Sequence, residues 1–292
     1  MITKSSSPSL PQTFSMAHPI ILVTGSTDGI GKATAAALLS SGAEVIIHGR
    51  NAKKGQNVQR ELKEKTGRRS PDLLIADLSD QNQVMQLAQD LLSHYTRLDV
   101  LINNAGTYEK ERRVTADGVE MTFAVNYLAP FLLTHSLLPL LKKSAPSRIV
   151  SVASTAHEDV DRFDWDNLQG ERHYDPWDTY ARSKFADIVF TYLLAQNIDG
   201  SGVTANCLHP GVVNTKMLRS AFPKMPGIPP EQGALTSVYL AVSPDVAGVS
   251  GQYFDNQQPV RSSALTYDRP VQERLWKMAE DRTEIGSDYQ TT

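Results

Sequence analysis

The sequence has little of the chemistry that would tie it to a disulfide framework, a membrane or a polyanion. Its 292 residues include one cysteine, Cys207, which has no partner for an internal disulfide. No stretch reaches the roughly 18 continuous apolar residues of a membrane span, so we expect a soluble, cytoplasmic protein without an integral membrane segment. The formal net charge of -3 gives no general attraction for nucleic acid, and no nucleic-acid partner is expected. A small molecule is the expected partner.

Metal-binding patterns are also missing. The segment of residues 155–178 carries His157 and His173 together with several aspartates. However, the chain has no pair of histidines three or four residues apart, which is the spacing that places two ligands on one helix face. We therefore expect no metal site.

The first 17 residues are rich in Ser and Pro and lack the apolar centre of a secretory signal. We interpret residues 1–17 as a mobile N-terminal tail. Targeting to an organelle stays open as an alternative, because the tail has no acidic residue, although it is short and contains no arginine. Residues 18–285 are expected to form a single domain and residues 286–292 a C-terminal tail.

Short apolar runs alternate with helical patterns along this domain. Residues 19–24, 43–48, 72–78 and 98–102 are β-branched or apolar runs of strand length, and helical segments separate them. Alternation of this kind predicts parallel strands joined by right-handed crossovers. The expected fold class is α/β: one doubly wound Rossmann-type parallel sheet, flanked by helices on both faces.

A glycine-rich turn joins the first predicted strand to a helix that begins near Lys32. Its spacing is G-x-x-x-G-x-G. Glycines at such a turn let backbone N–H groups and the helix N-terminus approach a pyrophosphate that a Cβ would obstruct. The turn therefore predicts a dinucleotide site. Its cofactor-binding residues are Gly25, Ser26, Thr27, Asp28, Gly29, Ile30 and Gly31.

The end of the second strand indicates which dinucleotide binds. NAD sites usually carry an acidic residue there to hold the ribose hydroxyls, whereas this chain has Arg50 and Asn51. A guanidinium suits a 2′-phosphate, so NADP(H) is favoured over NAD(H). Asp77 and Leu78 follow the third strand, and Asp77 either accepts from the adenine amino group or caps a helix, a role that Asp80 shares.

Further small and amide residues stand where the fourth predicted strand ends. Asn104, Ala105 and Gly106 follow the apolar run of residues 98–102. The carboxyl ends of parallel strands form the ligand side of a doubly wound sheet, and small residues let the backbone pass close to a cofactor there. We assign these three residues to cofactor binding.

Tyr180 and Lys184 lie four residues apart in a helical run, and this spacing places both side chains on one face. A free tyrosine gives up its proton only near pH 10, so acid–base work near neutrality needs about 4 kcal/mol of stabilisation of the phenolate. The Lys184 ammonium is placed to supply part of it. The spacing alone also arises by chance, so the rest of the chain has to support this interpretation.

Two more polar residues join this candidate site. Ser154 ends a predicted strand on the ligand side and is a candidate donor to a substrate oxygen. Asn126 lies in an apolar helix near Pro130, which removes a backbone hydrogen bond and permits a kink or bulge. Asn126 either satisfies that local break or holds a water in a proton path, or both.

Taken together, the motifs resemble the short-chain dehydrogenase/reductase family in its retinol-dehydrogenase-like branch. They occur in the family's order over residues 19–256. The matching residues are TGSTDGIG at 24–31, NNAG at 103–106, Asn126, Ser154, Tyr180 with Lys184, and HPG at 209–211.

The resemblance implies a catalytic tetrad of Asn126, Ser154, Tyr180 and Lys184. Tyr180 would transfer a proton at the substrate oxygen, Ser154 would polarise that oxygen, Lys184 would tune Tyr180 and contact the nicotinamide ribose, and Asn126 would fix a water. The resemblance also places further residues at the nicotinamide or the substrate. These are Pro210, Gly211, Val213 and Thr215 for the cofactor, with Val212 beside them at the substrate. Two further substrate candidates come from their places in the chain: Phe222 in the substrate lid expected near residues 212–230, where a packing role is an equal alternative, and His157 in the loop of residues 155–178.

The expected activity is NADP(H)-dependent transfer of a hydride between nicotinamide and an aldehyde, ketone or alcohol. Residues 216–230 are short and mixed and lack the apolar membrane-associating segment of many branch members, which favours a soluble carbonyl substrate over a retinoid. Two alternatives stay open: a catalytically idle, NADP-binding redox-sensing regulator, and a reductase of carbon–carbon double bonds. Family members commonly pair through their central helices, so a homodimer or homotetramer is expected.

Overall fold

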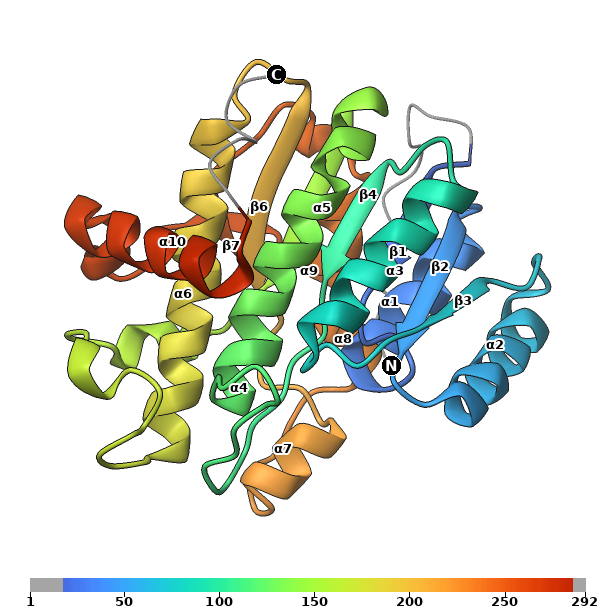
Figure 1. Cartoon of the computed structure of the whole chain (residues 1–292). Coiled ribbons are helices and arrows are strands. Elements are labelled where there is room, and N and C mark those ends of the chain that lie inside the picture. Colours follow the sequence, from blue (N-terminus) through green and yellow to red (C-terminus); the bar gives the residue numbers. More distant parts are fainter. Residues whose placement is uncertain (1–17, 286–292) are drawn as a thin grey trace, which may run out of the picture.

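The structure is a computed structural model that describes residues 18–285, and both predicted tails lie outside these residues. An eight-stranded sheet forms its centre, in the order β3-β2-β1-β4-β5-β6-β7-β8 (Figure 1). Seven strands are parallel and β8 pairs antiparallel with β7. The strands are β1 Ile20–Val23, β2 Glu44–Gly49, β3 Asp72–Ile75, β4 Val100–Asn103, β5 Ser147–Val152, β6 Val203–His209, β7 Tyr253–Asp255 and β8 Gln258–Val260.

The predicted fold class is confirmed, and β8 is an addition. The strand order reverses between β1 and β4, which opens a crevice at the carboxyl ends of the strands. β8 is too short and polar to be recognised as a strand in the sequence. It forms because Asn256 and Gln257 both adopt positive φ, 47° and 64°, in the tight hairpin turn that leads back from β7.

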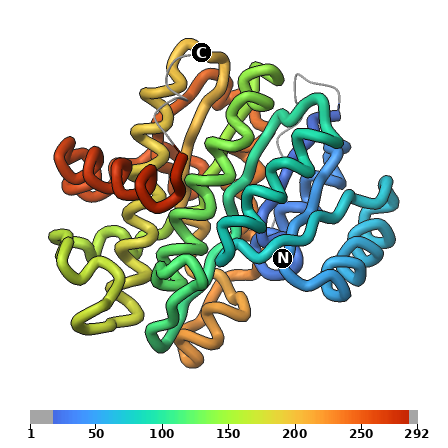
Figure 2. Tube along the Cα trace, in the orientation of Figure 1, coloured from blue at the N-terminus to red at the C-terminus, as the bar shows by residue number. Residues whose placement is uncertain are grey.

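Helices cover both faces of the sheet (Figures 1 and 2). One apolar core joins the sheet to α3, α5, α6 and α10, and a second joins it to α1, α2 and α9. The helices are α1 Gly29–Ser40, α2 Ala52–Thr66, α3 Gln81–His94, α4 Met121–Phe123, α5 Ala129–Lys143, α6 Pro176–Asn197, α7 Lys216–Ala221, α8 Pro230–Gly233, α9 Leu235–Val242 and α10 Arg269–Thr283.

A π-helical turn, Ala124–Leu128, interrupts the helical stretch that runs from α4 into α5. Pro130 has no N–H to give to the carbonyl four residues earlier, that of Asn126, so a regular α-helical ladder is impossible here. By length and composition Met121–Lys143 could cross a membrane, but 83% of its most apolar window is buried inside the protein. This is the burial of a core helix and only weak evidence for a membrane span.

The last helix, α10, lies across α5 and α6 rather than extending into solvent (Figure 2). Its Trp276 packs edge-on against Phe131 of α5 at a ring distance of 5.1 Å, and Leu275 is fully buried. The apolar stripe of this helix is therefore core cover. Phe185 and Ile188 of α6 also have no exposed surface.

Candidate active site

The glycine turn between β1 and α1 is held from within by backbone and hydroxyl bonds. Ser26 is fully buried; its Oγ donates to the Val23 carbonyl at 2.8 Å and accepts from the His48 N–H at 2.9 Å. Gly31 has no room for a side chain, because a Cβ there would lie 2.3 Å from Asn104 Nδ2. The turn is thus pressed between the ends of β2 and β4, and the N–H groups of the first turn of α1 face outward without carbonyl partners in the helix.

His48 supports the same turn from the end of β2. Its Nδ1 accepts from the Gly25 N–H at 3.1 Å and its Nε2 donates to the Ala76 carbonyl at 3.1 Å. Burial lowers the pKa of His48 to about 4, so the ring is neutral at physiological pH. This geometry makes His48 a support of the glycine turn.

Arg50 extends from the end of β2 into solvent and makes no hydrogen bond or ion pair with the residues that the structure describes. Asn51, predicted to bind cofactor, caps α2: its side-chain oxygen accepts a hydrogen bond from the Lys54 N–H at 2.9 Å. Lys54 in turn reaches back to Asp28 in the glycine turn, with Nζ 2.6 Å from Oδ2. This hydrogen bond lowers the pKa of Asp28. Lys54 therefore contacts the turn through Asp28, and Arg50 is an exposed cation directly after β2.

Two aspartates follow β3, and the structure gives them different contacts. Asp80 is the N-cap of α3 and accepts from the N–H groups of Asn82 and Gln83. Asp77 instead accepts from the N–H and Oγ of Ser79 at 3.0 and 2.8 Å and stays half-buried beside the crevice, with Leu78 buried next to it. The helix-cap role thus belongs to Asp80, and Asp77 is left at the predicted adenine edge.

The segment after β4 is tied to the first strand through a single hydroxyl. Thr24 Oγ1 donates to the Ile102 carbonyl and accepts from the N–H groups of Asn104 and Ala105, both at 3.0 Å. Asn104 Nδ2 adds a bond to the Thr24 carbonyl at 2.8 Å. A Cβ on Gly25 would lie 2.8 Å from the Ala105 Cα. These contacts hold the backbone of residues 104–106 against the glycine turn.

Helix α6 carries both Tyr180 and Lys184. It begins at Pro176, with Asp175 as its N-cap. Tyr180 is half-buried, whereas the Lys184 side chain is 6% exposed and donates to the Val152 carbonyl at 2.9 Å and to Asp187 Oδ2 at 2.8 Å. The predicted shared face is present: Lys184 lies below Tyr180 in the protein interior.

Asn126 lies in the π-helical turn and is 1% exposed. Its Oδ1 accepts from the Thr107 N–H at 2.7 Å, and its Nδ2 donates to the Thr107 carbonyl at 3.0 Å and to Ser183 Oγ at 2.9 Å. The side chain therefore ties the segment after β4 to α6. These contacts satisfy the side-chain amide itself and do not reach a backbone group of the π-helical turn, so both roles that the sequence leaves open stay predictions.

Ser154 follows β5 as the N-cap of a short 3₁₀ helix and lines the crevice, and its Oγ accepts from the Ala156 N–H at 3.1 Å. The position predicted for His157 is wrong: the ring is fully buried and does not line the substrate cavity. Its Nδ1 donates to the Ser154 carbonyl at 2.7 Å and its Nε2 accepts from the Ser263 N–H at 3.2 Å. The sequence placed His157 near the site but could not reveal that the C-terminal segment covers it.

A cavity of about 310 Å³ opens at the carboxyl ends of the strands. Tyr180 and Ser154 lie at its polar end, and Ile30 of α1 and Thr215 lie toward the predicted cofactor site. The other walls are mostly apolar. They include Val212, Val213, Met217, Leu218, Ala221, Phe222 and Met225 of the lid region, together with Tyr108 and Trp177.

The lid that includes α7 is anchored at its base and loosely packed at its tip. The Asn214 N–H donates to the Ile228 carbonyl and the Ile228 N–H to the Val212 carbonyl, both at 2.8 Å. None of the six residues of α7 is buried. At the tip, the ring of Phe222 packs against two other rings, with its centroid 5.6 Å from that of Tyr108 and 5.5 Å from that of Trp177.

Tyr108 and Trp177 are site residues that the sequence reasoning missed. The Tyr108 ring lies 5.7 Å from that of Tyr180, and burial raises the pKa of Tyr108. Trp177 lies 6.1 Å from Tyr180 and donates from Nε1 to Asp159 at 2.8 Å. A signal existed for both: Tyr108 directly follows the residues at the end of β4, and Trp177 is three residues before Tyr180 on the same helix face.

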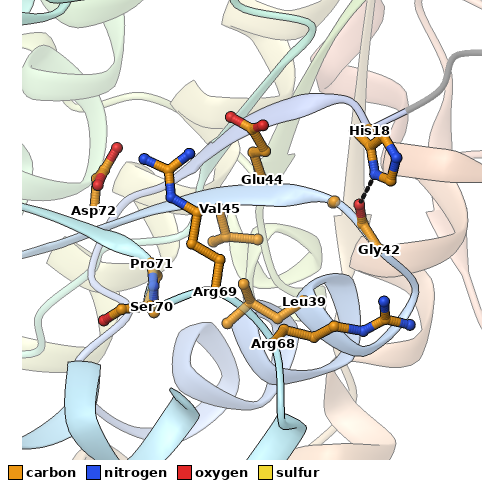
Figure 3. A pocket seen from close by; sticks show the side chains of 11 residues that line it. His18, Leu39, Gly42, Glu44, Val45, Arg68, Arg69, Ser70, Pro71 and Asp72 are labelled. Carbon is orange, nitrogen blue, oxygen red and sulfur yellow. Dashed lines mark hydrogen bonds between the residues drawn. The ribbon is translucent and has the colours of Figure 1, made fainter.

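A second cavity, of about 210 Å³, lies at the opposite end of the strands (Figure 3). Glu44 and Asp72, at the starts of β2 and β3, line it with Arg68 and Arg69 of the intervening loop. Ligands of doubly wound sheets bind outside the carboxyl ends of the strands, so this cavity is not the candidate active site. Among residues 18–285, no group of three or more His, Cys, Asp or Glu side chains is placed to hold a metal ion.

The residues at the crevice fit a nicotinamide dinucleotide. The glycine turn exposes unpaired N–H groups at the start of α1, where a pyrophosphate is favoured by hydrogen bonding and by the helix dipole. Gly29 adopts φ +51°, a conformation that L side chains rarely take, so the close approach there depends on glycine. The crevice therefore has the form of a dinucleotide-dependent oxidoreductase site.

Comparison with known proteins agrees with this class. The model of the short chain dehydrogenase family matches residues 19–226, and the chain belongs to that family. Retinol dehydrogenase 14 of Mus musculus is 40% identical over 282 residues, covering 89% of this chain and 84% of that protein. Polyprenol dehydrogenase of Homo sapiens is 39% identical over 282 residues, covering 91% and 85%. The predicted family, its retinol-dehydrogenase-like branch and an alcohol or carbonyl oxidoreductase activity are thereby confirmed.

Solved structures resemble the chain over most of its length. A short chain dehydrogenase from Escherichia coli CFT073 complexed with NADPH is 32% identical, with a TM-score of 0.69, and the match covers 85% of this chain and all of that one. A protein from Mycobacterium paratuberculosis is 29% identical with a TM-score of 0.77, covering 94% and 96%. A nicotinamide cofactor is therefore established for this chain at the level of the family.

Proposed function

We propose that this protein is an NADP(H)-dependent oxidoreductase that interconverts an apolar aldehyde or ketone and its alcohol, with Tyr180 as the acid–base group. The observation that carries the proposal is that Tyr180 and Ser154 share the polar end of one apolar cavity, directly above the buried Lys184. A reacting oxygen placed there would meet a proton donor and a hydrogen-bond donor while the rest of the substrate contacts apolar walls.

The glycine turn, residues 104–106 and Asp77 would hold the dinucleotide. Arg50 and Lys54 would meet a 2′-phosphate, because Lys54 contacts the turn through Asp28, and the exposed Arg50 directly follows β2 and has no partner among the described residues. When bound, the nicotinamide supplies a hydride to the carbonyl carbon or accepts one from the alcohol carbon. Thr215 lines the substrate cavity on the side of the turn and would lie at the nicotinamide end.

In the direction of reduction, Tyr180 gives its proton to the carbonyl oxygen while Ser154 Oγ–H donates a hydrogen bond to the same atom. In the direction of oxidation, the Tyr180 phenolate takes the proton of the alcohol. Lys184 stabilises that phenolate through its positive charge, and Val152 and Asp187 hold the ammonium in place. Asn126 holds the Thr107 backbone beside this group.

The walls of the cavity support an apolar substrate. Phe222, Tyr108 and Trp177 present rings to it, and the lid adds Met217 and Leu218. Retinol and polyprenol, after which the relatives are named, are long apolar alcohols, and aldehydes of that character suit these walls better than small polar carbonyls. The sequence alone favours a soluble aldehyde or ketone instead, and the experiment described next compares the two kinds of substrate.

The test is a panel of aldehydes and ketones of rising apolar length, followed through NADPH absorbance. We expect turnover to rise with apolar length and Tyr180→Phe to lower kcat by at least a thousandfold. Tyr239→Phe is the matched control, because this half-buried tyrosine of α9 is outside the crevice and makes no hydrogen bond with the described residues. Turnover that survives Tyr180→Phe would disprove the assigned chemistry.

A second variant tests the cofactor preference. Arg50→Gln should raise the KM for NADPH about tenfold or more and leave that for NADH nearly unchanged, because only NADPH carries the 2′-phosphate. Binding of NADPH without turnover of any carbonyl would favour the idle regulator instead. Reduction of a carbon–carbon double bond, with no activity on carbonyls, would favour the other alternative from the sequence, a double-bond reductase.

A further inference from the structure

The ammonium of Lys184 is paired with a carboxylate that the proposed chemistry does not require. Lys184 Nζ lies 2.8 Å from Asp187 Oδ2, three residues further along α6, and the two side chains are 6% and 4% exposed. The Val152 carbonyl accepts a second hydrogen bond from the same ammonium at 2.9 Å. Burying a paired carboxylate costs desolvation free energy. This cost indicates that Asp187 has a function beside Lys184.

The two charges coexist in a region with few others. Burial lowers the pKa of Lys184, but the Asp187 carboxylate more than offsets this and holds it above its ordinary value. Burial raises the pKa of Asp187 to about 6, so at neutral pH the pair is ionised. The other titratable groups that face Asp187 are Tyr127 of the π-helical turn and Cys207 of β6, and burial raises the pKa of each, which keeps both neutral.

Charge also reaches this region from α10 and from the catalytic residue itself. Glu280 of α10 acts on Tyr127, which separates it from the ion pair. Tyr180 is the remaining group that exchanges a proton beside Lys184, and it interacts with the ammonium directly. Any effect of Asp187 on the charge of Lys184 therefore also changes the electrostatic interaction between Lys184 and Tyr180.

We propose that Asp187 is a positioning residue that anchors Lys184 and cancels part of its charge, which weakens the stabilisation that Lys184 gives to a Tyr180 phenolate and biases the site toward carbonyl reduction. The inference rests on the proposed role of Tyr180. An ammonium with no counter-ion would stabilise the phenolate fully and favour alcohol oxidation. With the carboxylate present, that stabilisation is smaller.

The expected size of the effect follows from the helix. Tyr180 and Asp187 are seven residues apart, which is about 10 Å along an α-helix. At an effective dielectric constant near 20, two unit charges at that distance interact strongly enough to shift a titration by about one pH unit. The Val152 carbonyl remains to hold the ammonium when the carboxylate is removed.

The experiment compares the pH profiles of alcohol oxidation for the whole protein and for Asp187→Asn, which removes the charge and keeps an oxygen that can accept from Lys184. We expect the rising limb of kcat to move down by about one pH unit, with roughly a tenfold gain in oxidation rate on that limb. Asp281→Asn is the control, because Asp281 is also an acid paired with a cation, Lys277, but it lies on α10 with its side chain exposed. Its profile should superimpose on that of the wild type.

A titration without turnover separates this inference from the proposed function. Tyrosinate absorbance is followed against pH in the apoprotein, and the signal of Tyr180 is taken as the difference from Tyr180→Phe in each background. Asp187→Asn should ionise Tyr180 about one pH unit lower, whether or not any substrate is turned over. An unchanged midpoint, or one that moves to higher pH, would overturn the proposal. Circular dichroism of each variant verifies that it is folded.

Discussion

The glycine turn and the lid face each other across the crevice and are built in opposite ways. The turn is held by buried polar groups: Thr24, Ser26 and His48 satisfy backbone N–H and carbonyl groups at distances near 3 Å. The lid has hydrogen bonds at its base, and aromatic contacts hold its tip at Phe222. Directional bonds fix one geometry, whereas apolar contacts tolerate several. A site for one unchanging cofactor suits the first arrangement, and a cavity for an apolar substrate suits the second.

The largest effect should come from the tightest point of the turn. Gly31→Ala places a Cβ 2.3 Å from Asn104 Nδ2 and 2.6 Å from the Gly25 carbonyl, so the turn must shift. We expect NADPH affinity to fall on the order of a hundredfold, or about 3 kcal/mol, in a fluorescence titration. Gly67→Ala is the control, because that glycine has positive φ but nothing near its Cβ. It should cost about 1 kcal/mol of stability and leave affinity unchanged.

Acid should weaken the turn through His48. Its pKa in the fold, about 4, is below the ordinary value of 6.5, so the unfolded chain binds the proton more readily. The stabilisation is complete above pH 6.5 and is lost as pH falls through 4, a change of roughly 3 kcal/mol. Urea unfolding of the wild type and of His48→Asn between pH 7 and 4 measures it. Equal slopes for the two proteins would contradict the assignment; His135, whose pKa is also about 4, contributes equally to both.

The Thr24 hydroxyl should matter next. Thr24→Val keeps the shape but leaves the Ala105 N–H without its acceptor, and the Asn104 N–H keeps only the Ile102 carbonyl. We expect a loss of about 2 kcal/mol in the free energy of unfolding, because buried donors without partners bear a desolvation cost. Thr204→Val on β6 is the control and should change stability by less than about 1 kcal/mol, since no bond of its hydroxyl is seen. A similar loss for both would remove the special role of Thr24.

The lid should give the smallest change in stability. Phe222→Ala removes two ring contacts at the tip, and we expect less than about 1 kcal/mol of lost stability by thermal unfolding. The same variant should lower kcat/KM for a long apolar aldehyde about tenfold, and Phe222→Leu should restore most of it. A loss of several kcal/mol in stability would show that the lid belongs to the rigid core and would end the contrast with the glycine turn.

Much of the site follows from local pattern. The strand, glycine turn and helix at residues 19–40, and the spacing of Tyr180 and Lys184, are set by neighbours in the chain, and the structure has them at the expected places. His157 shows the limit of this reasoning. It lies three residues after Ser154, but the contact that buries it comes from Ser263, more than a hundred residues later. Nothing in the local sequence indicates such a partner.

The sequence by itself determined the family, the succession of strands and helices along the chain, and the groups able to move a proton, because short-range spacing and periodicity encode them. Tertiary structure alone decided that Tyr108, Trp177 and Phe222 meet over Tyr180, that α10 covers α5 and α6, and that β8 closes the sheet. These contacts join segments far apart in the chain. They form because burying apolar surface lowers the free energy wherever complementary faces meet, and that complementarity is a property of the folded shape.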